Sequence, residues 1–157
     1  MAKRLLLILG TSVIAVALLA FNSSMIKGYI QRRQFKRTLK AYNIDLGKAD
    51  YSIQNYYYEA PFTEFWRYYA VIFESAAPKC LFESPPFHDG LDESAALWVD
   101  ATDSGMKRKN PSIQTIDYKD AALKSKRIFR NGTDARRYLI IIYDSEKDLY
   151  HFIDVSE

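Results

Sequence analysis

The first 44 residues of the chain contain no acidic side chain, and this asymmetry limits what the chain can fold into. An uncharged apolar run extends from Leu5 to Phe21, and the first carboxylate is Asp45. As a helix this run spans about 25 Å, and continuing it to Ile26 gives about 33 Å, enough to cross a bilayer. The sequence therefore predicts a membrane anchor over residues 1–26, a single-pass transmembrane helix of the signal-anchor type.

A cleaved signal peptide is the competing interpretation of the same run, because Lys3 and Arg4 form a positive n-region ahead of it. The candidate cleavage sites fit poorly. The small residues at 15 and 17 would leave Leu18 to Phe21 as an apolar new N-terminus, and a site after Ala20 has Leu18 at its first position. We therefore expect the anchor to be retained.

A basic segment follows the anchor, and we interpret residues 27–48 as a juxtamembrane helix. Its basic residues are Lys27, Arg32, Arg33, Lys36, Arg37 and Lys40. The last five share one side of a helix, and Phe35, Leu39 and Tyr42 fall toward the other side. Such a helix suits the membrane surface, where each basic side chain near anionic lipid contributes about 1 kcal/mol. A solvated helical stalk is the open alternative.

The two flanks of the anchor disagree about sidedness. The positive-inside rule sets six basic residues after the run against Lys3 and Arg4 before it, which would hold the body in the cytoplasm. Five of the six lie more than ten residues beyond Phe21, and a short charged N-terminus is hard to translocate. We therefore favour a body on the extracytoplasmic side, in the periplasm. In a cytoplasmic body the basic residues could contact nucleic acid, but the acidic body disfavours that partner.

The body of the chain is acidic and rich in aromatic rings. Of 22 Lys and Arg, eight precede Asp45, which leaves 14 against 19 Asp and Glu, a net charge of −5. Aromatic residues make up 15% of the sequence and can fill a core without disulfides, which a single cysteine, Cys80, cannot form within the chain. About 110 residues suffice for one domain, so we predict one α+β domain over residues 49–157.

Aromatic residues concentrate between Tyr51 and Phe73, where ten of 23 positions are aromatic. Within residues 62–73 the pattern fits a helical stripe and a buried strand equally well, and both stay open. Core packing explains most of these rings, whereas a cradle of rings would give a partner rigid contact area. The candidate binding residues are Tyr57, Trp66, Tyr69, Trp98 and His151.

The C-terminal third carries the clearest strand pattern. Asn131-Gly132 supplies the positive φ values of a tight hairpin turn. The last strand alternates, with His151 on one side and Asp154 on the other. With helical propensity before it, this pattern predicts an α+β fold with a four- or five-stranded antiparallel meander. The predicted strands are Leu97–Val99, Ile113–Tyr118, Arg127–Arg130, Tyr138–Tyr143 and Leu149–Val155, with a loop at Ala76–Gly90 and an exposed basic turn at Gly105–Pro111.

Few residues suggest covalent or metal chemistry. Cys80 and His88 could form a thiol nucleophile and its base, but their separation across Pro85 and Pro86 neither requires nor forbids contact. The oxygen-rich residues 100–105 lack the ligand spacing of a calcium loop, and the two histidines show no zinc-site spacing. We therefore predict no catalytic residues, no metal site and no cofactor.

Together these features predict a single-pass, membrane-tethered protein-binding or assembly module of the cell envelope that is not an enzyme. Its expected partners are membrane lipid, through the basic helix, and another envelope protein. One alternative is an inhibitor or immunity protein, whose acidic surface would cover a basic toxin or enzyme. Another is a membrane-bound cysteine hydrolase that uses Cys80 and His88.

Overall fold

The structure is a computed structural model that describes residues 23, 25–60, 65–78, 81, 88–111, 113, 116, 118, 122–129 and 136–156. The predicted transmembrane run, Leu5 to Phe21, lies outside these residues. In the part of the chain that is described, no helix is both long enough and apolar enough to cross a membrane.

The chain divides into two compact units, Met1–Gln34 and Phe35–Glu157. The division falls within a helix of residues 25–40, which we call the basic helix. Four large apolar side chains of its first part are exposed: Met25, Ile26, Tyr29 and Ile30. The second unit contains the end of the basic helix and every strand that the structure describes. We refer to this second unit as the domain.

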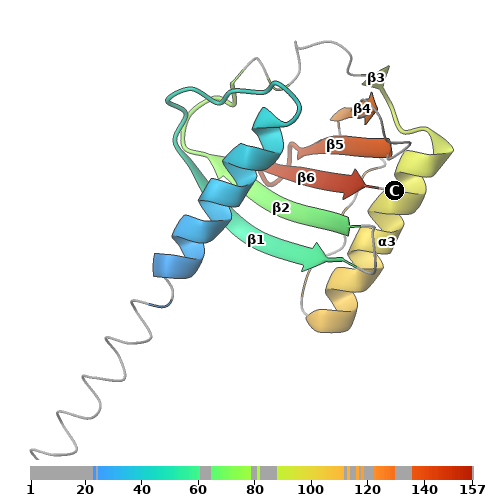
Figure 1. Ribbon diagram of the computed structural model, residues 1–157, viewed down its shortest axis with the longest axis horizontal. Coiled ribbons are helices and arrows are strands. Elements are labelled where there is room, and N and C mark those ends of the chain that lie inside the picture. Colours follow the sequence, from blue (N-terminus) through green and yellow to red (C-terminus); the bar gives the residue numbers. More distant parts are fainter. Residues whose placement is uncertain are drawn as a thin grey trace, which may run out of the picture. The chain divides into compact units, whose positions relative to one another are not determined.

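The domain is α+β, with one sheet of six described strands (Figure 1). The strands are β1 (Tyr51–Glu59), β2 (Phe65–Phe73), β3 (His88–Asp89), β4 (Ala122–Phe129), β5 (Arg136–Asp144) and β6 (Leu149–Ser156). Their order is β1-β2-β6-β5-β4-β3, and all neighbours pair antiparallel. A helix, α3 (Glu93–Lys109), joins β3 to β4 along the chain. The last strand in sequence, β6, is therefore one of the two middle strands of the sheet and lies between β2 and β5.

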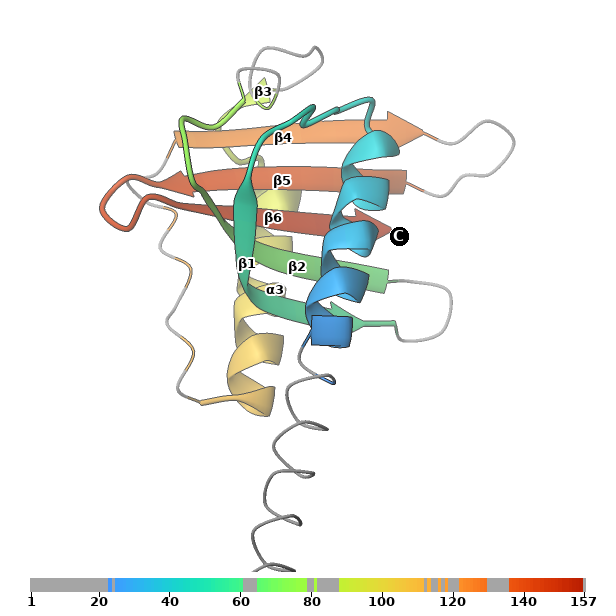
Figure 2. The same cartoon turned by 90° about the vertical axis from the view of Figure 1, so that its left-hand side faces the viewer.

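Both faces of the sheet bury side chains of β1, β2, β5 and β6, one face against the end of the basic helix and the other against α3 (Figure 2). Neighbouring residues of a strand point to opposite faces. Tyr69 of β2 packs in one cluster with Phe35 and Leu39 of the basic helix, and we call this side the basic-helix face. Tyr68 packs in a second cluster with Val99 of α3, and we call this side the α3 face.

The predicted C-terminal strands are confirmed in part. Tyr138–Tyr143 and Leu149–Val155 lie within β5 and β6, and β4 ends within the predicted strand Arg127–Arg130. β6 then pairs with β2, so the whole sheet is not the simple meander that we predicted. The described residues of the predicted strand Ile113–Tyr118 lie outside the strands.

α3 occupies two segments that the sequence pattern assigned differently. The predicted strand at Leu97–Val99 is wrong, and so is the basic turn predicted from Gly105, because residues 93–109 are helical. Asp92 precedes the helix as its N-cap, and its side chain accepts a hydrogen bond from the Ala95 N–H at 2.8 Å. A three-residue apolar run alone does not distinguish a strand from a helix. The N-cap residue Asp92 was the signal that would have indicated a helix.

The aromatic segment forms strands. Residues 65–73 are β2, so the strand alternative is right for them and the helical stripe is wrong. β1 precedes it and pairs with it antiparallel, with a bulge between Ile53 and Asn55. The bulge shifts the alternation by one position, so that Ile53 and Tyr56 both face the basic-helix cluster.

The basic helix ends in a Schellman motif. The Ile44 N–H donates to the Leu39 carbonyl and the Asn43 N–H to the Lys40 carbonyl, each at 3.0 Å. Asn43 has the left-handed conformation that the motif requires, with φ at 58°. The motif turns the chain so that Ile44 and Leu39 are buried in the same cluster on the sheet.

Candidate binding surface

The structure places the five candidate binding residues on both faces of the sheet. Tyr57, Trp66, Trp98 and His151 lie on the α3 face, whereas Tyr69 lies on the basic-helix face. The rings of Trp66 and Trp98 are 5.7 Å apart, which brings β2 and α3 together. Tyr57, Tyr69 and His151 are buried, and both tryptophans are half-buried. These rings therefore build the core, and their contact with a partner stays a prediction.

His151 is a buried histidine in the centre of the sheet, with 6% of its surface exposed. Its Nδ1 lies 2.9 Å from the Tyr68 hydroxyl, and its Nε2 has no hydrogen-bond partner among the described residues. Burial lowers the pKa of His151 to about 4. Burial, with a smaller effect from the charge of Asp103, raises the pKa of Tyr68. The pair is therefore uncharged near neutral pH.

On the opposite face, the fully buried carboxylate of Asp154 lies at the centre of an ionic cluster. It accepts two hydrogen bonds from Arg137, at 2.9 and 2.8 Å, and one from Arg67 at 3.2 Å. The Tyr42 hydroxyl, just beyond the basic helix, donates a fourth at 2.8 Å. Burial alone would lower the pKa of Arg137, but its bonds to Asp154 outweigh this effect and raise it. Two cations share one anion, so the cluster carries one excess positive charge.

The sequence reasoning missed this cluster. It placed Asp154 and His151 on opposite sides of the last strand, which is correct, but it gave Asp154 no partner. A usable signal was present, because a charged residue inside an otherwise apolar strand needs a countercharge if it is buried. Arg67 in β2 and Arg137 in β5 carry the same signal in neighbouring strands.

The end of β1 meets the last turns of α3. The Tyr57 hydroxyl donates to the Glu59 carboxylate, and burial followed by this bond raises the pKa of Tyr57 to about 12. A Cβ atom added at Gly105 would overlap the Tyr57 hydroxyl oxygen and lie 3.0 Å from Cζ. Lys109 Nζ lies 4.7 Å from the centre of the Tyr57 ring and makes a long, 3.5 Å hydrogen bond to the Tyr58 carbonyl. α3 therefore crosses this strand closely, at a glycine.

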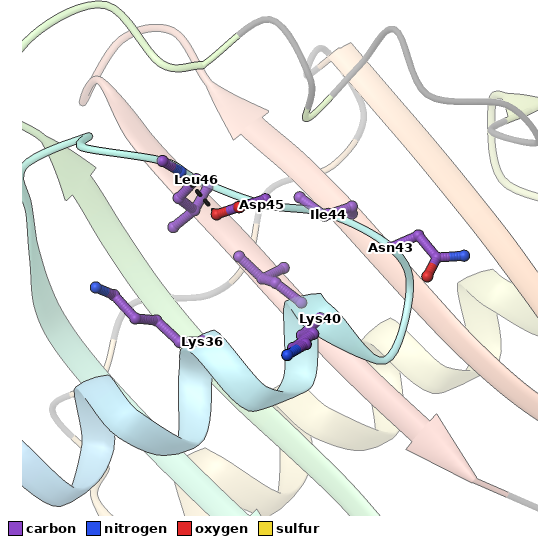
Figure 3. Close-up of a pocket in the computed structure, with 8 residues that line it drawn as sticks. Lys36, Lys40, Asn43, Ile44, Asp45 and Leu46 are labelled. Carbon is purple, nitrogen blue, oxygen red and sulfur yellow. Dashed lines mark hydrogen bonds between the residues drawn. The ribbon is translucent and has the colours of Figure 1, made fainter.

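A hollow of about 470 Å³ lies between the end of the basic helix and the loop after it (Figure 3). Its lining residues are Lys36, Leu39, Lys40, Asn43, Ile44, Asp45, Leu46 and Gly47. The Asp45 side chain accepts a hydrogen bond from the Gly47 N–H at 2.9 Å. Lys36 and Lys40 are exposed near the helix C-terminus, where the helix dipole favours cations, so their position has a structural explanation.

The six residues predicted to contact the membrane surface are all exposed. They are Lys27, Arg32, Arg33, Lys36, Arg37 and Lys40. Phe35, Thr38 and Leu39 of the same helix are buried in the domain. The helix is thus amphipathic in the predicted sense, with its apolar residues from Phe35 onward packed on the sheet. Contact of the basic residues with lipid stays a prediction.

The predicted pairing of Cys80 with His88 falls outside what the structure describes, because Cys80 is not among the described residues. Within the described ranges, no group of three or more His, Cys, Asp or Glu side chains is placed to hold a metal ion. No known protein family, curated protein or solved structure matches this chain.

Proposed function

We propose that this chain is a single-pass, membrane-tethered protein-binding or assembly module of the cell envelope. The observation that carries the proposal is the order of its segments. An uncharged apolar run, Leu5 to Phe21, is followed by six exposed basic side chains and only then by the acidic part of the chain, from Asp45 onward. The apolar run would anchor the chain, and each basic residue would add about 1 kcal/mol of attraction to anionic lipid.

The exposed apolar side chains of the basic helix support lipid contact. Met25, Ile26, Tyr29 and Ile30 follow the i, i+1, i+4, i+5 spacing that gathers side chains on one side of a helix. A helix with exposed apolar and basic residues close to an anchor suits the boundary between head groups and acyl chains.

The construction of the domain supports a binding role. Strands β1, β2, β5 and β6 bury side chains on both faces of the sheet, and the buried Asp154 cluster fixes three strands and the segment after the basic helix to one another. A scaffold that is already rigid loses little conformational entropy when its edges and loops bind a partner.

Sidedness and anchoring are the first properties to test. A C-terminal epitope tag would be exposed to protease in intact cells or spheroplasts, with a membrane fraction analysed in parallel. We expect the full-size chain in the membrane fraction and digestion of the tag from outside. A soluble, shortened chain would show cleavage of the anchor, and protection of the tag until lysis would place the domain in the cytoplasm; either result contradicts the proposal.

The binding role is tested by crosslinking in intact membranes followed by purification of the tagged chain. We expect a protein partner that is recovered reproducibly and is lost when the crosslinker is omitted. Complete absence of crosslinked protein, with the chain folded and present in the membrane, would contradict a protein-binding module.

A further inference from the structure

The outer edge of β1 is open to a further strand. β1 pairs with β2 on its inner side and with no other described strand (Figure 1). It has nine residues, no proline, and no charged residue before Glu59. Proteins commonly blunt such edges with charges, prolines or short strands, and the strand at the opposite edge, β3, has only two described residues. β1 is therefore the edge better suited to strand addition.

Two side-chain hydrogen bonds identify the backbone groups that face outward. The Tyr56 N–H donates to the Asn55 side-chain oxygen at 2.8 Å, and Lys109 Nζ donates to the Tyr58 carbonyl at 3.5 Å. Neither group is therefore directed at β2. Because alternate residues of an antiparallel strand point their backbone groups to the same side, Tyr56 and Tyr58 both present theirs at the outer edge.

These two bonds act as weak caps on the edge. Each is made by a single side chain, and the bond to Lys109 is long. An incoming strand would replace the caps with backbone hydrogen bonds to the Tyr56 N–H and the Tyr58 carbonyl. Such caps would compete with an incoming strand without closing the edge.

Positive charge lies on both sides of this edge. On the basic-helix face, the Arg67 guanidinium lies 5.4 Å from the centre of the Tyr58 ring and belongs to the cluster with one excess positive charge. On the α3 face, Arg108 and Lys109 are exposed in the last turn of the helix, and these two cations outnumber the carboxylate beside them, Glu59 of β1. Neighbouring side chains of an added strand point to opposite faces, so two consecutive carboxylates would meet cations on both sides.

The same charges argue against a second copy of the chain as the occupant. Pairing two β1 strands about a two-fold axis at Tyr56 to Tyr58 would bring the basic last turns of two α3 helices together, and like charges at an interface cost affinity. We propose that the edge of β1 at Tyr56 to Tyr58 binds an acidic protein segment in extended conformation, which adds to the sheet as a further strand. This inference rests on the proposed function, because it names the partner class of the binding module.

The experiment measures binding of fluorescent peptides to the full chain in a mild non-ionic detergent by anisotropy. The probe is a short peptide of Val and Thr with two adjacent glutamates at its centre. We expect saturable binding that weakens at least ten-fold when the glutamates become lysines, and at least ten-fold when alternate amides of the peptide are N-methylated. The lysine change tests charge, and N-methylation tests backbone pairing.

Two variants of the protein test the site. Arg108→Gln removes an exposed cation beside the edge and should weaken binding of the acidic peptide several-fold. Asn55→Ala removes the cap on the Tyr56 N–H and should tighten binding several-fold, a gain that loss of folding cannot imitate. Lys147→Gln, in the β5–β6 hairpin, is the matched control and should leave binding unchanged.

Tighter binding of the lysine peptide would overturn the acidic partner class and favour a basic one. Equal binding of the N-methylated peptide would overturn strand addition, and a dimer abolished by β1 substitutions would make a second copy the occupant. If no peptide binds while membrane crosslinking still recovers a partner, the proposal of binding at this edge is overturned and the proposed function stands. Loss of the crosslinked partner would instead overturn the proposed function.

Discussion

At the scale of single residues, Asp154 links more parts of the fold than its position in the last strand indicates. A carboxylate without solvent contact is tolerated because three side chains donate four hydrogen bonds to it. Those donors come from β2, from β5 and from the segment after the basic helix. Removing the carboxylate would leave the nearly buried Arg137 without its anion, which costs more than the pair contributes.

Asp154→Ala should lower the free energy of unfolding by about 3 to 5 kcal/mol, measured by urea denaturation. Lys147→Ala breaks an exposed ion pair with Asp144 and should cost less than about 1 kcal/mol. Replacing the buried pair together, with Arg137→Met and Asp154→Leu, should recover much of the loss, because no fully buried charge is then unpaired and the remaining cation, Arg67, keeps contact with solvent. Similar costs for Asp154→Ala and Lys147→Ala would show that burial does not strengthen the cluster.

His151 should make stability depend on pH. Its pKa is about 4 in the folded protein and about 6.5 when unfolded, so the unfolded state binds the proton more readily. Its contribution is therefore complete above pH 6.5 and is lost as pH falls from about 6.5 to about 4, by about 3 kcal/mol in total. The difference between wild type and His151→Gln in urea midpoints across this range measures the effect. Ser104→Ala, which changes an exposed, non-titrating residue and keeps His151, should retain the wild-type slope.

At the scale of elements, α3 and β1 are fitted to each other at Gly105. Glycine usually weakens a helix interior, and replacing it with alanine commonly stabilises by about 0.5 to 1 kcal/mol. Here the added methyl group would overlap the buried Tyr57 hydroxyl. Gly105→Ala should therefore destabilise by about 1 to 3 kcal/mol. Thermal unfolding measures this loss, and Ser104→Ala, a change at an exposed neighbour on the same helix, is the control. Adding Tyr57→Phe, which removes the hydroxyl, should partly restore the stability lost in Gly105→Ala.

The end of the basic helix depends on Asn43 in its left-handed conformation. Asn43→Gly should leave the free energy of unfolding unchanged or raise it by up to about 1 kcal/mol, because glycine adopts this conformation without strain. Asn43→Val should lower it by about 1 to 2 kcal/mol, because a β-branched residue resists positive φ. Urea denaturation of both variants checks this pair, and equal stability of the two would mean that the Schellman motif does not hold the helix end.

At the scale of the whole molecule, the sequence predicted the α+β class and β5 and β6, where apolar runs have the length of strands. It failed at α3, where a short apolar run resembled a strand and the cap at Asp92 was overlooked. It identified rings such as Trp66 and Trp98 but not the Asp154 cluster, because partners 17 and 87 residues away are joined only by strand pairing. Strand order is a property of the assembled sheet, and local patterns do not encode it.

The basic helix should respond to lipid charge. In nanodiscs that contain anionic lipid, Lys36 and Lys40 of the full chain should acylate more slowly than in neutral nanodiscs, by mass spectrometry. High salt should remove the difference, because it screens exposed charges. Lys147, at the hairpin, serves as the internal control. No dependence on lipid charge would favour the solvated stalk.

The place of β6 at the centre of the sheet has a consequence for how the chain is made. β2 and β5 are joined only through β6, which the ribosome synthesises after the other five described strands. The β2–β6 pairs lie about 80 to 90 residues apart in sequence, and such distant contacts form slowly. Until residues 149–156 emerge, the nascent chain would carry two unfinished strand edges, a period in which chaperones or neighbouring chains have access to them.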